Sequence, residues 1–453
     1  MAKDSDGRTA IVMGGSIAGL WVARVLADHV DNVVVLERDQ LPDGPEFRSG
    51  TPQARQYHVL LLRGLQIMDE LFPGMRQELC DAGAIQFDTV NDVAVRSRGR
   101  WLDQFPSNQM LLSCSRLLLE VVMRRRLQRM AQVRFLERVE VINLHTDEQR
   151  AKVTGVNIRS TGDGEQPRGP ETTLRADLVV DALGRRSPTP QWLTELGYQA
   201  PPETVVDSFL GYVTRRYRKP EAHLASCPTL LITANPPHDT RGGLIFPEEN
   251  NTLVVMMAGA NKDYPPVDED GFQEFARSLG PEFYAVVQAA EPISKPYGYR
   301  GTDSRWRHYE RLERWPERFV VLGDAFCGFN PIYGQGMTVA ALAAVALGQE
   351  LQQAGDRLDG VAQRAIRAIG KATKGAWLLA TSADLEWPAT VGADMSQAPA
   401  DRFGRWYVGK LLDAMAYDRT LRLAFLDVNQ LVRPATSLFT PGLMLRVFRS
   451  LMS

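Results

Sequence analysis

The chain has 453 residues, which is enough for two or three domains around a large core. Hydrophobic residues make up 44% and charged residues 23%, as in ordinary globular proteins, and a net charge of −2 gives no overall field that would favour nucleic acid as a partner. The four cysteines (Cys80, Cys114, Cys227 and Cys327) are scattered without the spacing of a disulfide framework or a zinc site, so we expect a reducing compartment and no metal.

The N-terminal residues MAKDSDGR are polar and lead directly into a predicted strand. The sequence has no apolar run of the roughly 18 residues that a membrane span requires. We therefore expect a cytoplasmic protein without a signal peptide or a transmembrane segment.

The first predicted unit is a strand, a glycine-rich turn and a helix. Residues Thr9–Met13 form an apolar run typical of a buried strand, and the motif GGSIAG follows at residues 14–19. A second apolar strand, Asn32–Leu36, ends on Glu37, 18 residues after the last glycine. A tight turn, a helix start for pyrophosphate and an acid for ribose hydroxyls together predict a dinucleotide-binding unit. Ser16 replaces the middle glycine of GxGxxG, and we expect the site to tolerate it because serine is small and its hydroxyl can reach a phosphate.

Two later segments have cations next to predicted helix starts. Arg55 and His58 lie just before an apolar helix, where they either meet a ligand or serve as a solvated cation and a structural histidine. Arg116 lies in the first turn of another helix, for which Ser113 or Ser115 is the predicted cap. A cation there opposes the helix dipole, which is easier to understand if an anionic ligand shares the site.

Residues 201–299 consist mainly of β-branched and alternating segments separated by turn residues, which predicts a second, sheet-based domain. One amphipathic helix is predicted to interrupt it at Glu269–Leu279. With a predicted hairpin at residues 90–110, this sheet is expected to form the other wall of a pocket. Strand side chains of this kind are more often core than ligand contacts. The candidate substrate-pocket residues are Tyr212, Phe246, Met256 and Tyr333.

The segment Gly323–Ala344 combines the end of a predicted buried strand with a Pro/Gly-rich loop and a predicted core helix. Asp324, at the carboxyl end of the strand, is suited to accept hydrogen bonds from sugar-like hydroxyls. Gly334 and Gly336 would let a flat ring approach the backbone, and the helix start favours an anionic or electron-accepting ligand. The alternative is a plain strand, turn and helix with Asp324 as a cap.

The chain beyond Gly348 is predicted to be mainly helical. Its last helix, GLMLRVFRSLMS, is apolar and carries Arg446 and Arg449. It could make peripheral contact with a membrane surface, but its shortness and few cations favour packing on the pocket or on a dimer partner.

Four separated motifs carry a resemblance to a known family. The turn GGSIAG with Glu37, the SRxxLE helix with Arg116, the DALGRRSP segment and GDAFCGFNPIYGQG resemble the FAD-dependent monooxygenases of the para-hydroxybenzoate hydroxylase type. Within that superfamily, PQARQYHVLLLRG, LVVDALGRRSP, VVLGDAFCGFNPIYGQGM and GAWLLATSADLEWP look most like the lasalocid-type olefin epoxidases of bacterial polyether polyketide biosynthesis, which are relatives of squalene epoxidase. The resemblance extends to about residue 390.

The resemblance implies an α/β fold with three parts. These are a discontinuous Rossmann-like FAD-binding domain (residues 1–89, 111–200 and 300–380), an inserted β-sheet substrate domain (residues 90–110 and 201–299) and a C-terminal helical region (residues 381–453).

The resemblance also implies a set of residues around FAD. The glycine turn receives the pyrophosphate, Glu37 holds the adenosine ribose, Arg55 and Arg116 contact phosphates or nearby flavin groups, and the loop before the core helix flanks the isoalloxazine. The implied cofactor-binding residues are Gly14, Gly15, Ser16, Ala18, Gly19, Glu37, Arg38, Arg55, Arg116, Gly184, Asp324, Pro331, Gly334, Gly336 and Met337.

The third motif departs from the hydroxylase pattern. Many aromatic hydroxylases have Asp-Gly there, linked to FAD and NADPH handling, whereas here Leu183 precedes Gly184 and Asp181 lies two residues earlier. No second GxGxxG motif is present. NADPH or NADH would therefore bind transiently, or a separate flavin reductase would supply electrons.

The resemblance implies a monooxygenase that inserts one oxygen atom from O2 through a flavin hydroperoxide. Because the second sheet is apolar with few acid/base residues, we favour epoxidation of olefins in a lipophilic polyketide or terpenoid of secondary metabolism, and assign no catalytic residue or metal. An aromatic hydroxylase, a prenyl double-bond reductase and a non-catalytic flavin-binding scaffold are the alternatives. A halogenase is disfavoured because its WxWxIP segment is absent. The substrate, the stereochemistry and the oligomeric state are left open.

Overall fold

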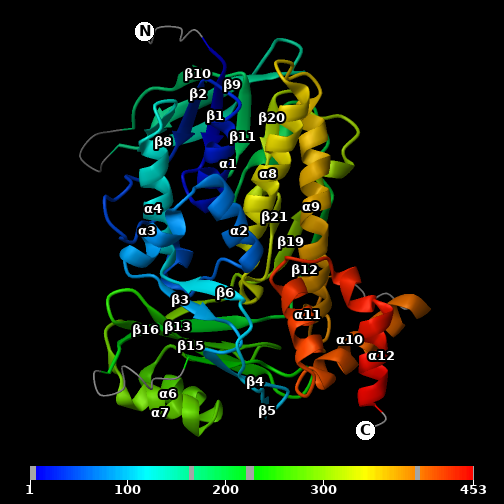
Figure 1. Cartoon of the computed structure of the whole chain (residues 1–453). Coiled ribbons are helices and arrows are strands. Elements are labelled where there is room, and N and C mark those ends of the chain that lie inside the picture. Colours follow the sequence, from blue (N-terminus) through cyan, green and yellow to red (C-terminus); the bar gives the residue numbers. More distant parts are fainter. Residues whose placement is uncertain (1–6, 163–167, 221–228, 393–397, 452–453) are drawn as a thin grey trace.

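The structure, a computed structural model, describes residues 7–162, 168–220, 229–392 and 398–451 (Figure 1). A five-stranded parallel sheet with the order β20-β11-β1-β2-β7 organises its first part. The strands are β1 (Thr9–Met13), β2 (Asn32–Leu36), β7 (Val133–Leu136), β11 (Leu178–Asp181) and β20 (Phe319–Val321). Most of their residues are apolar and buried, as expected for a parallel sheet covered on both faces.

The register of this sheet brings distant segments to one edge. Met13 at the end of β1 pairs with Asp181 at the end of β11, and Asp181 pairs with Val321 at the end of β20. Leu36 of β2 lies opposite Met13 on the other side. The loops that follow these strands therefore start next to one another.

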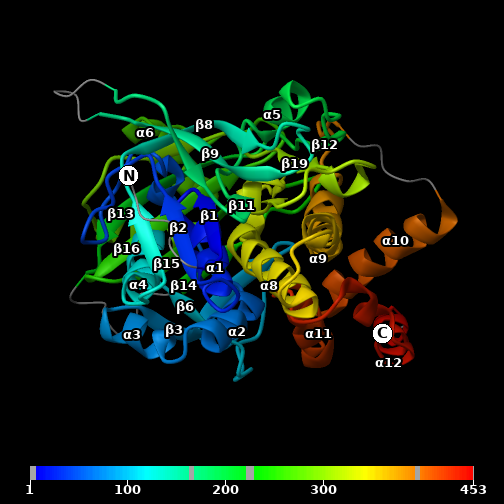
Figure 2. The same cartoon turned by 90° about the horizontal axis from the view of Figure 1, so that it is seen from above.

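Helices cover this sheet. Figure 2 shows α1 (Ile17–Leu26), α8 (Gly336–Ala354) and α9 (Val361–Asp384) side by side, and α1 packs against α8 as α8 packs against α9. The buried side of α1 is almost entirely apolar, which suits a helix enclosed by a sheet and other helices. The other helices of this part are α2 (Leu62–Leu71), α3 (Met75–Asp81), α4 (Arg116–Gln128) and α5 (Thr189–Glu195).

Three small antiparallel sheets connect the parts. They are β8 (Val139–Thr146), β9 (Val153–Ser160) and β10 (Thr172–Arg175); β12 (Glu203–Val206), β19 (Ser304–Arg307) and β21 (Cys327–Gly328); and β3 (Ile85–Asp88) with β6 (Met110–Ser113).

A larger, mostly antiparallel sheet lies below β3 and β6 in Figure 1. Its strands are β4 (Val93–Ser97), β5 (Arg100–Trp101), β13 (Gly211–Arg218), β14 (Thr229–Ile232), β15 (Arg241–Glu248), β16 (Thr252–Gly259), β17 (Glu291–Pro292) and β18 (Tyr297–Tyr299). The predicted hairpin is present as β4 and β5, and β4 pairs with β14. The two faces of this sheet belong to different cores, because successive side chains alternate.

One face of the larger sheet, with Val213, Ile245 and Met257, packs against two helices, α6 (Glu269–Ser278) and α7 (Pro281–Ala289). The sequence predicts only the first, so the prediction of a single helix is wrong. The signal for the second was Gly280-Pro281, since proline is favoured at the first position of a helix. The opposite face, with Tyr212, Phe246 and Met256, joins the core of the parallel sheet.

The C-terminal segment is helical, as predicted, with α10 (Pro399–Ala414), α11 (Arg419–Asn429) and α12 (Pro441–Ser450). In α12 Val447 is fully buried in a cluster with Tyr407 of α10, whereas Leu445 and Phe448 are exposed. The last helix therefore packs on its own chain, and contact with a membrane stays a prediction. None of the helices in the described ranges combines the length and the apolar character needed to cross a bilayer.

The predicted α/β fold is confirmed, while the division into domains stays a prediction. Cys227 lies outside the described residues, and the other three cysteines are free thiols.

Candidate active site

The glycine turn after β1 is closely packed. Gly14 has a φ of +107°, and a Cβ atom there would lie 2.6 Å from the carbonyl oxygen of Ala182, in the loop after β11. Its N–H donates to the carbonyl of Leu36 at 2.9 Å. Only glycine fits this position, and the turn delivers the free N–H groups at the start of α1 to the sheet edge.

Glu37 lies against this turn. Its side chain is buried, and Oε2 accepts a hydrogen bond from the N–H of Gly15 at 3.1 Å. Arg48 Nη1 lies 3.0 Å from Oε2, and Arg48 Nη2 lies 2.5 Å from Oε1 of Glu120. Sequence reasoning missed Arg48 and Glu120. A cue for Glu120 was its position four residues after Arg116 on one helix face, but nothing local points to Arg48.

Arg116 joins the start of α4 to the glycine turn. Its Nη2 donates to Oγ of Ser16 at 2.8 Å, and that hydroxyl lies 3.2 Å from Oε2 of Glu120. The structure places the cap of α4 at Ser115, whose Oγ accepts from the N–H of Leu118. The Nε of Arg116 is buried and has no hydrogen-bond partner within the described part of the chain. This Nε lies 3.5 Å from Oε2 of Glu120, so the cation at the helix start is directed at the turn and is also paired with an acid on its own helix.

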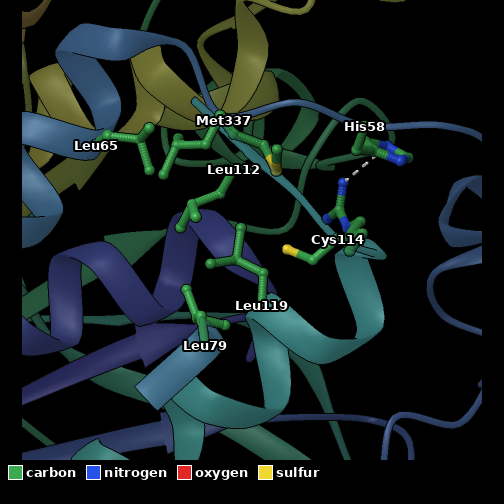
Figure 3. Close-up of a pocket in the computed structure, with 9 residues that line it drawn as sticks. His58, Leu65, Leu79, Leu112, Cys114, Leu119 and Met337 are labelled. Carbon is green, nitrogen blue, oxygen red and sulfur yellow. Dashed lines mark hydrogen bonds between the residues drawn. The ribbon is translucent and has the colours of Figure 1, made fainter. Parts of the chain in front are cut away.

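His58 lies beside Arg116, at 3.5 Å from ring nitrogen to guanidinium (Figure 3). Burial and the Arg116 charge lower the pKa of His58 to about 3, so the ring is neutral near pH 7. Both residues line a small pocket with Met337 and apolar side chains, among them Leu65 of α2 and Cys114. Its volume is ≈ 10 Å³, close to that of a single water molecule, so it is too small for a substrate.

Asp324 follows β20 at the same edge. Gly323 has a φ of +62°, and a Cβ atom there would lie 2.8 Å from Cβ of Ala18, so this segment meets the start of α1. Oδ1 of Asp324 lies 3.8 Å from the position of a Cβ atom on Gly336. Burial raises the pKa of Asp324, and Arg185, Arg116 and Arg307 oppose that rise. Its carboxylate accepts no hydrogen bond from the described residues, which leaves it available to a ligand.

The loop between Asp324 and α8 contains the turn Pro331–Tyr333, followed by Gly334 with a φ of +66°. The hydroxyl of Tyr333 donates to Oδ1 of Asp384 at 2.9 Å. Oε1 of Gln335 is buried without a hydrogen-bond partner among the described residues. The first N–H groups of α8, from Gly336, have no intrahelical partner.

Hydrogen bonds within the third motif, DALGRRSP, fix its conformation. Asp181 is fully buried and accepts hydrogen bonds from the N–H of Leu183 at 2.8 Å, from Oγ1 of Thr189 at 2.6 Å and from Oγ of Ser187. Gly184 follows with a φ of +78°. Asp181 therefore anchors its own loop and does not stand in for the Asp of an Asp-Gly motif.

Among the described residues, the side chains of Arg38 and Arg55 form no hydrogen bond or ion pair with the glycine turn or with Glu37. Arg38 is exposed and lines an open pocket of ≈ 320 Å³ that also includes Arg48. The guanidinium of Arg55 stacks between the rings of Phe47 at 4.3 Å and Tyr297 at 4.6 Å. No hydrogen bond or ion pair joins the Arg55 side chain to the glycine turn within the described ranges, so a phosphate contact by Arg55 stays a prediction.

The candidate substrate-pocket residues of the larger sheet share one face, the face that belongs to the core of the parallel sheet. The ring of Phe246 packs against Tyr57 at 5.3 Å and Phe87 at 5.4 Å, and Tyr212 packs against Tyr299 at 5.4 Å. Met256 lies opposite Leu244 in the β15–β16 register. Farther along the same face, Arg216 forms an ion pair of 2.7 Å with Glu248.

These residues fit an anionic, hydroxyl-bearing dinucleotide. A glycine turn, the guanidinium of Arg116 and the unpaired carboxylate of Asp324 meet at the carboxyl edge of a parallel sheet, where such ligands bind. Gly14, Ser16, Glu37, Arg116 and Asp324 are brought together, as the sequence predicts. No group of three or more possible metal ligands occurs among the residues that the structure describes.

Comparisons with known proteins identify a family that binds FAD. The family described as FAD binding domain matches residues 8–365. Protein Rv3254 of Mycobacterium tuberculosis is 35% identical over 413 residues, which cover 89% of this chain and 84% of that protein. Two solved structures share the fold. The flavin-dependent brominase Bmp2 has a TM-score of 0.66 at 15% identity, with 98% of each chain covered. The other, pqsL of Pseudomonas aeruginosa, a probable FAD-dependent monooxygenase, has a TM-score of 0.59 at 18% identity, with 92% of this chain and 99% of that chain covered.

Proposed function

The chain belongs to the FAD binding domain family of FAD-dependent monooxygenases, and from this premise we propose that it epoxidises olefins of a lipophilic polyketide or terpenoid. FAD is its cofactor, and the substrate is a small molecule with an apolar, unsaturated chain. The resemblance of several sequence motifs to the lasalocid-type epoxidases suggests this substrate class.

We propose that FAD lies along the carboxyl edge of the parallel sheet. The glycine turn and Arg116 bind the pyrophosphate, Glu37 binds the adenosine ribose, and Asp324 accepts hydrogen bonds from the ribityl hydroxyls. Pro331, Gly334, Gly336 and Met337 flank the ring. Arg48 belongs to this site as well, because it neutralises Glu37 and Glu120 within reach of the turn.

When reduced, FAD supplies the activation of O2 and the transfer of one oxygen atom to an electron-rich carbon. The protein excludes water and orients the substrate. Tyr212, Phe246 and Met256 are buried and largely apolar, so the transfer of a carbon chain from water to contact with them is favourable.

The observation that carries the proposal is the composition of that face. The side chains of that face on β13, β15 and β16 include Tyr212, Thr214, Leu244, Phe246, Val254, Met256 and Ala258. The carboxylate that lies farther along this face, Glu248, is occupied by its ion pair with Arg216, and none of the side chains in the list is an acid or an imidazole. An isolated alkene needs no base, whereas hydroxylation of a phenol requires ring ionisation.

Aromatic hydroxylation is the second candidate, because the rings of Tyr57, Phe87 and Phe246 lie together on this face and could stack on an aromatic substrate. The 15% identity to a brominase indicates the fold alone and gives no support for halogenation.

The test uses the purified holoprotein under ¹⁸O-labelled oxygen with linear polyenes and, in parallel, phenols. We expect one labelled oxygen atom per oxidised double bond, detected by mass spectrometry, and no product without FAD. Labelled phenols with unchanged polyenes would contradict epoxidation and support the second candidate. Unlabelled starting material in both series, with a reducible flavin, would contradict both.

The electron donor is tested first, under argon. We propose that NADPH or NADH binds transiently, or that a separate flavin reductase supplies electrons. Bleaching of the yellow protein by either nucleotide identifies a direct donor, and bleaching only after addition of a reductase identifies an external one. A yellow protein that resists every reductant would favour a structural flavin.

Ser16→Gly is expected to change FAD affinity by less than about tenfold, because the two hydrogen bonds that are lost join Ser16 to Arg116 and Glu120 and leave the N–H groups of the turn in place. The backbone at Ser16, with a φ of −93°, is open to any residue, and its hydroxyl contacts only side chains. Titration of apoprotein with FAD measures the effect. A loss of much more than tenfold would mean that the hydroxyl itself binds phosphate in an essential way.

A further inference from the structure

A buried carboxylate at the end of α9 connects three separate segments. Asp384 has no exposed surface, and its Oδ1 accepts three hydrogen bonds. The donors are Oγ of Ser208 at 2.8 Å, Nδ2 of Asn330 at 2.9 Å and Oη of Tyr333 at 2.9 Å. A single oxygen atom thus joins a helix, the approach to the larger sheet and the loop before α8.

The contacts of Asn330 extend this connection. Its N–H donates to Oγ of Ser304 at 2.9 Å, and its Oδ1 accepts from the N–H of Ile332 at 3.3 Å. Asn330 has no exposed surface. The turn from Asn330 to Gly334 is therefore held at its first residue and at Tyr333, and Asp384 contacts both side chains. Ser208 leads into β13, which carries Tyr212.

The second oxygen of this carboxylate is different. Oδ2 is buried and has no hydrogen-bond partner within the described chain. Burial and, to a lesser extent, the charge of Asp207 raise the pKa of Asp384 to about 6, against the three donors. The other titratable groups near it are Tyr333 and Glu386, whose pKa values burial also raises. Asp384 can therefore gain or lose a proton near pH 6, whereas the hydroxyl of Tyr333 stays neutral.

We infer that Asp384 is a positioning residue whose ionised carboxylate holds the Asn330–Gly334 turn in the conformation that binds the flavin ring. The inference rests on the proposed placement of that ring. A carboxylate accepts stronger hydrogen bonds from Tyr333 and Asn330 than a neutral acid does. Uptake of a proton weakens this hold, so the ionisation of Asp384 is coupled to FAD affinity.

As the pH rises, the ionisation of Asp384 changes the stability of the protein and its affinity for FAD in opposite directions. Because the folded-state pKa of Asp384 is raised above its ordinary value of 3.8, its contribution to stability is complete below about pH 4 and is lost as the pH rises through about 6. FAD affinity changes in the other direction, since the ionised form orders the turn. Asparagine imitates the neutral acid and does not titrate.

The experiment measures the dissociation constant of FAD and the melting temperature of the full chain from pH 5 to pH 8. For the wild type we expect FAD affinity to increase about fivefold over this range, as hydrogen bonds to a neutral group become bonds to a charged one. For Asp384→Asn we expect wild-type affinity at pH 5, no increase with pH, and a melting temperature above that of the wild type at pH 8. The Tyr333→Phe variant should show a smaller increase of FAD affinity with pH, because one of the three hydrogen bonds to Asp384 is missing.

Asp88→Asn is the matched control. Asp88 is also buried and accepts from the N–H of Val90 at 2.9 Å and from Oγ of Ser107, but its pKa is lowered to about 2, so it does not titrate in this range. This variant should follow the pH dependence of the wild type. His58, with a pKa of about 3, does not contribute to the pH dependence of FAD affinity between pH 5 and pH 8.

An Asp384→Asn protein that follows the wild type at every pH would overturn the inference. So would a constant loss of affinity at every pH, which would indicate a purely structural role. A wild type that takes up no FAD would overturn both this inference and the proposed function. If FAD affinity depends on pH as expected but the protein oxidises no olefin, only the proposed substrate class would be rejected.

Discussion

Asp324→Ala is expected to weaken FAD binding by about tenfold to a hundredfold, because hydrogen bonds to a charged acceptor contribute about 1.5–3 kcal/mol. Asp324 lies at the edge where the glycine turn and the start of α8 meet, and its carboxylate accepts no hydrogen bond from the described residues. Its removal also leaves the charges of Arg185, Arg116 and Arg307 less balanced. Titration of the apoprotein, followed by flavin fluorescence, measures the loss.

Asp177→Ala is the control for this variant. Asp177 lies just before β11, at the amino edge of the same sheet, where it accepts from the N–H of Thr9 at 3.0 Å and pairs with Arg318 at 3.3 Å. It should lower the melting temperature and leave the dissociation constant of FAD unchanged. Full flavin occupancy in Asp324→Ala at FAD concentrations near the wild-type dissociation constant would remove Asp324 from the site.

Gly19→Ala is expected to abolish FAD binding at ordinary concentrations, with a loss of about a hundredfold or more. A Cβ atom at Gly19 would lie 1.8 Å from the carbonyl oxygen of Gly14, so the turn has to open before the methyl group fits. Overpacking of this kind costs about 1–3 kcal/mol in stability, and the displaced N–H groups no longer converge on a phosphate.

Gly375→Ala tests whether the effect comes from the contact or from the loss of a helical glycine. Gly375 also lies within a helix, α9, but it is exposed and a Cβ atom there would meet nothing within 4 Å. Alanine at this position should stabilise the helix by up to about 1 kcal/mol. Equal FAD affinity in the Gly19→Ala and Gly375→Ala variants would show that the turn tolerates a side chain, against the proposed site.

The parts of the site that could be predicted are those whose signal is local. The strand Thr9–Met13, the turn after it and the acid Glu37 follow one another within 29 residues, and a parallel strand places its loop at a known edge. Asp324 could be predicted for the same reason, since it follows an apolar run and precedes a helix.

The remainder depends on pairings between distant residues. Arg48 meets Glu120 72 residues away, and Asp384 meets Ser208 176 residues away. Neither contact leaves a periodicity or a motif in the chain, because each is set by the packing of whole elements. The helix α7 was missed for another reason: its apolar residues resemble those of the neighbouring strands, and only Gly280-Pro281 indicated a helix start.

The strand order of the parallel sheet also bears on how the protein is made. β20 is the last of its strands along the chain, yet it pairs with β11, and β11 pairs with β1. About 310 residues separate Gly14 from Asp324, so the nucleotide cradle closes only after most of the polypeptide has left the ribosome. Pairing between strands so distant in sequence makes folding of this sheet slow. A bound flavin would contact the loops after both β1 and β20, and because it binds only the folded protein it would raise the free energy of unfolding.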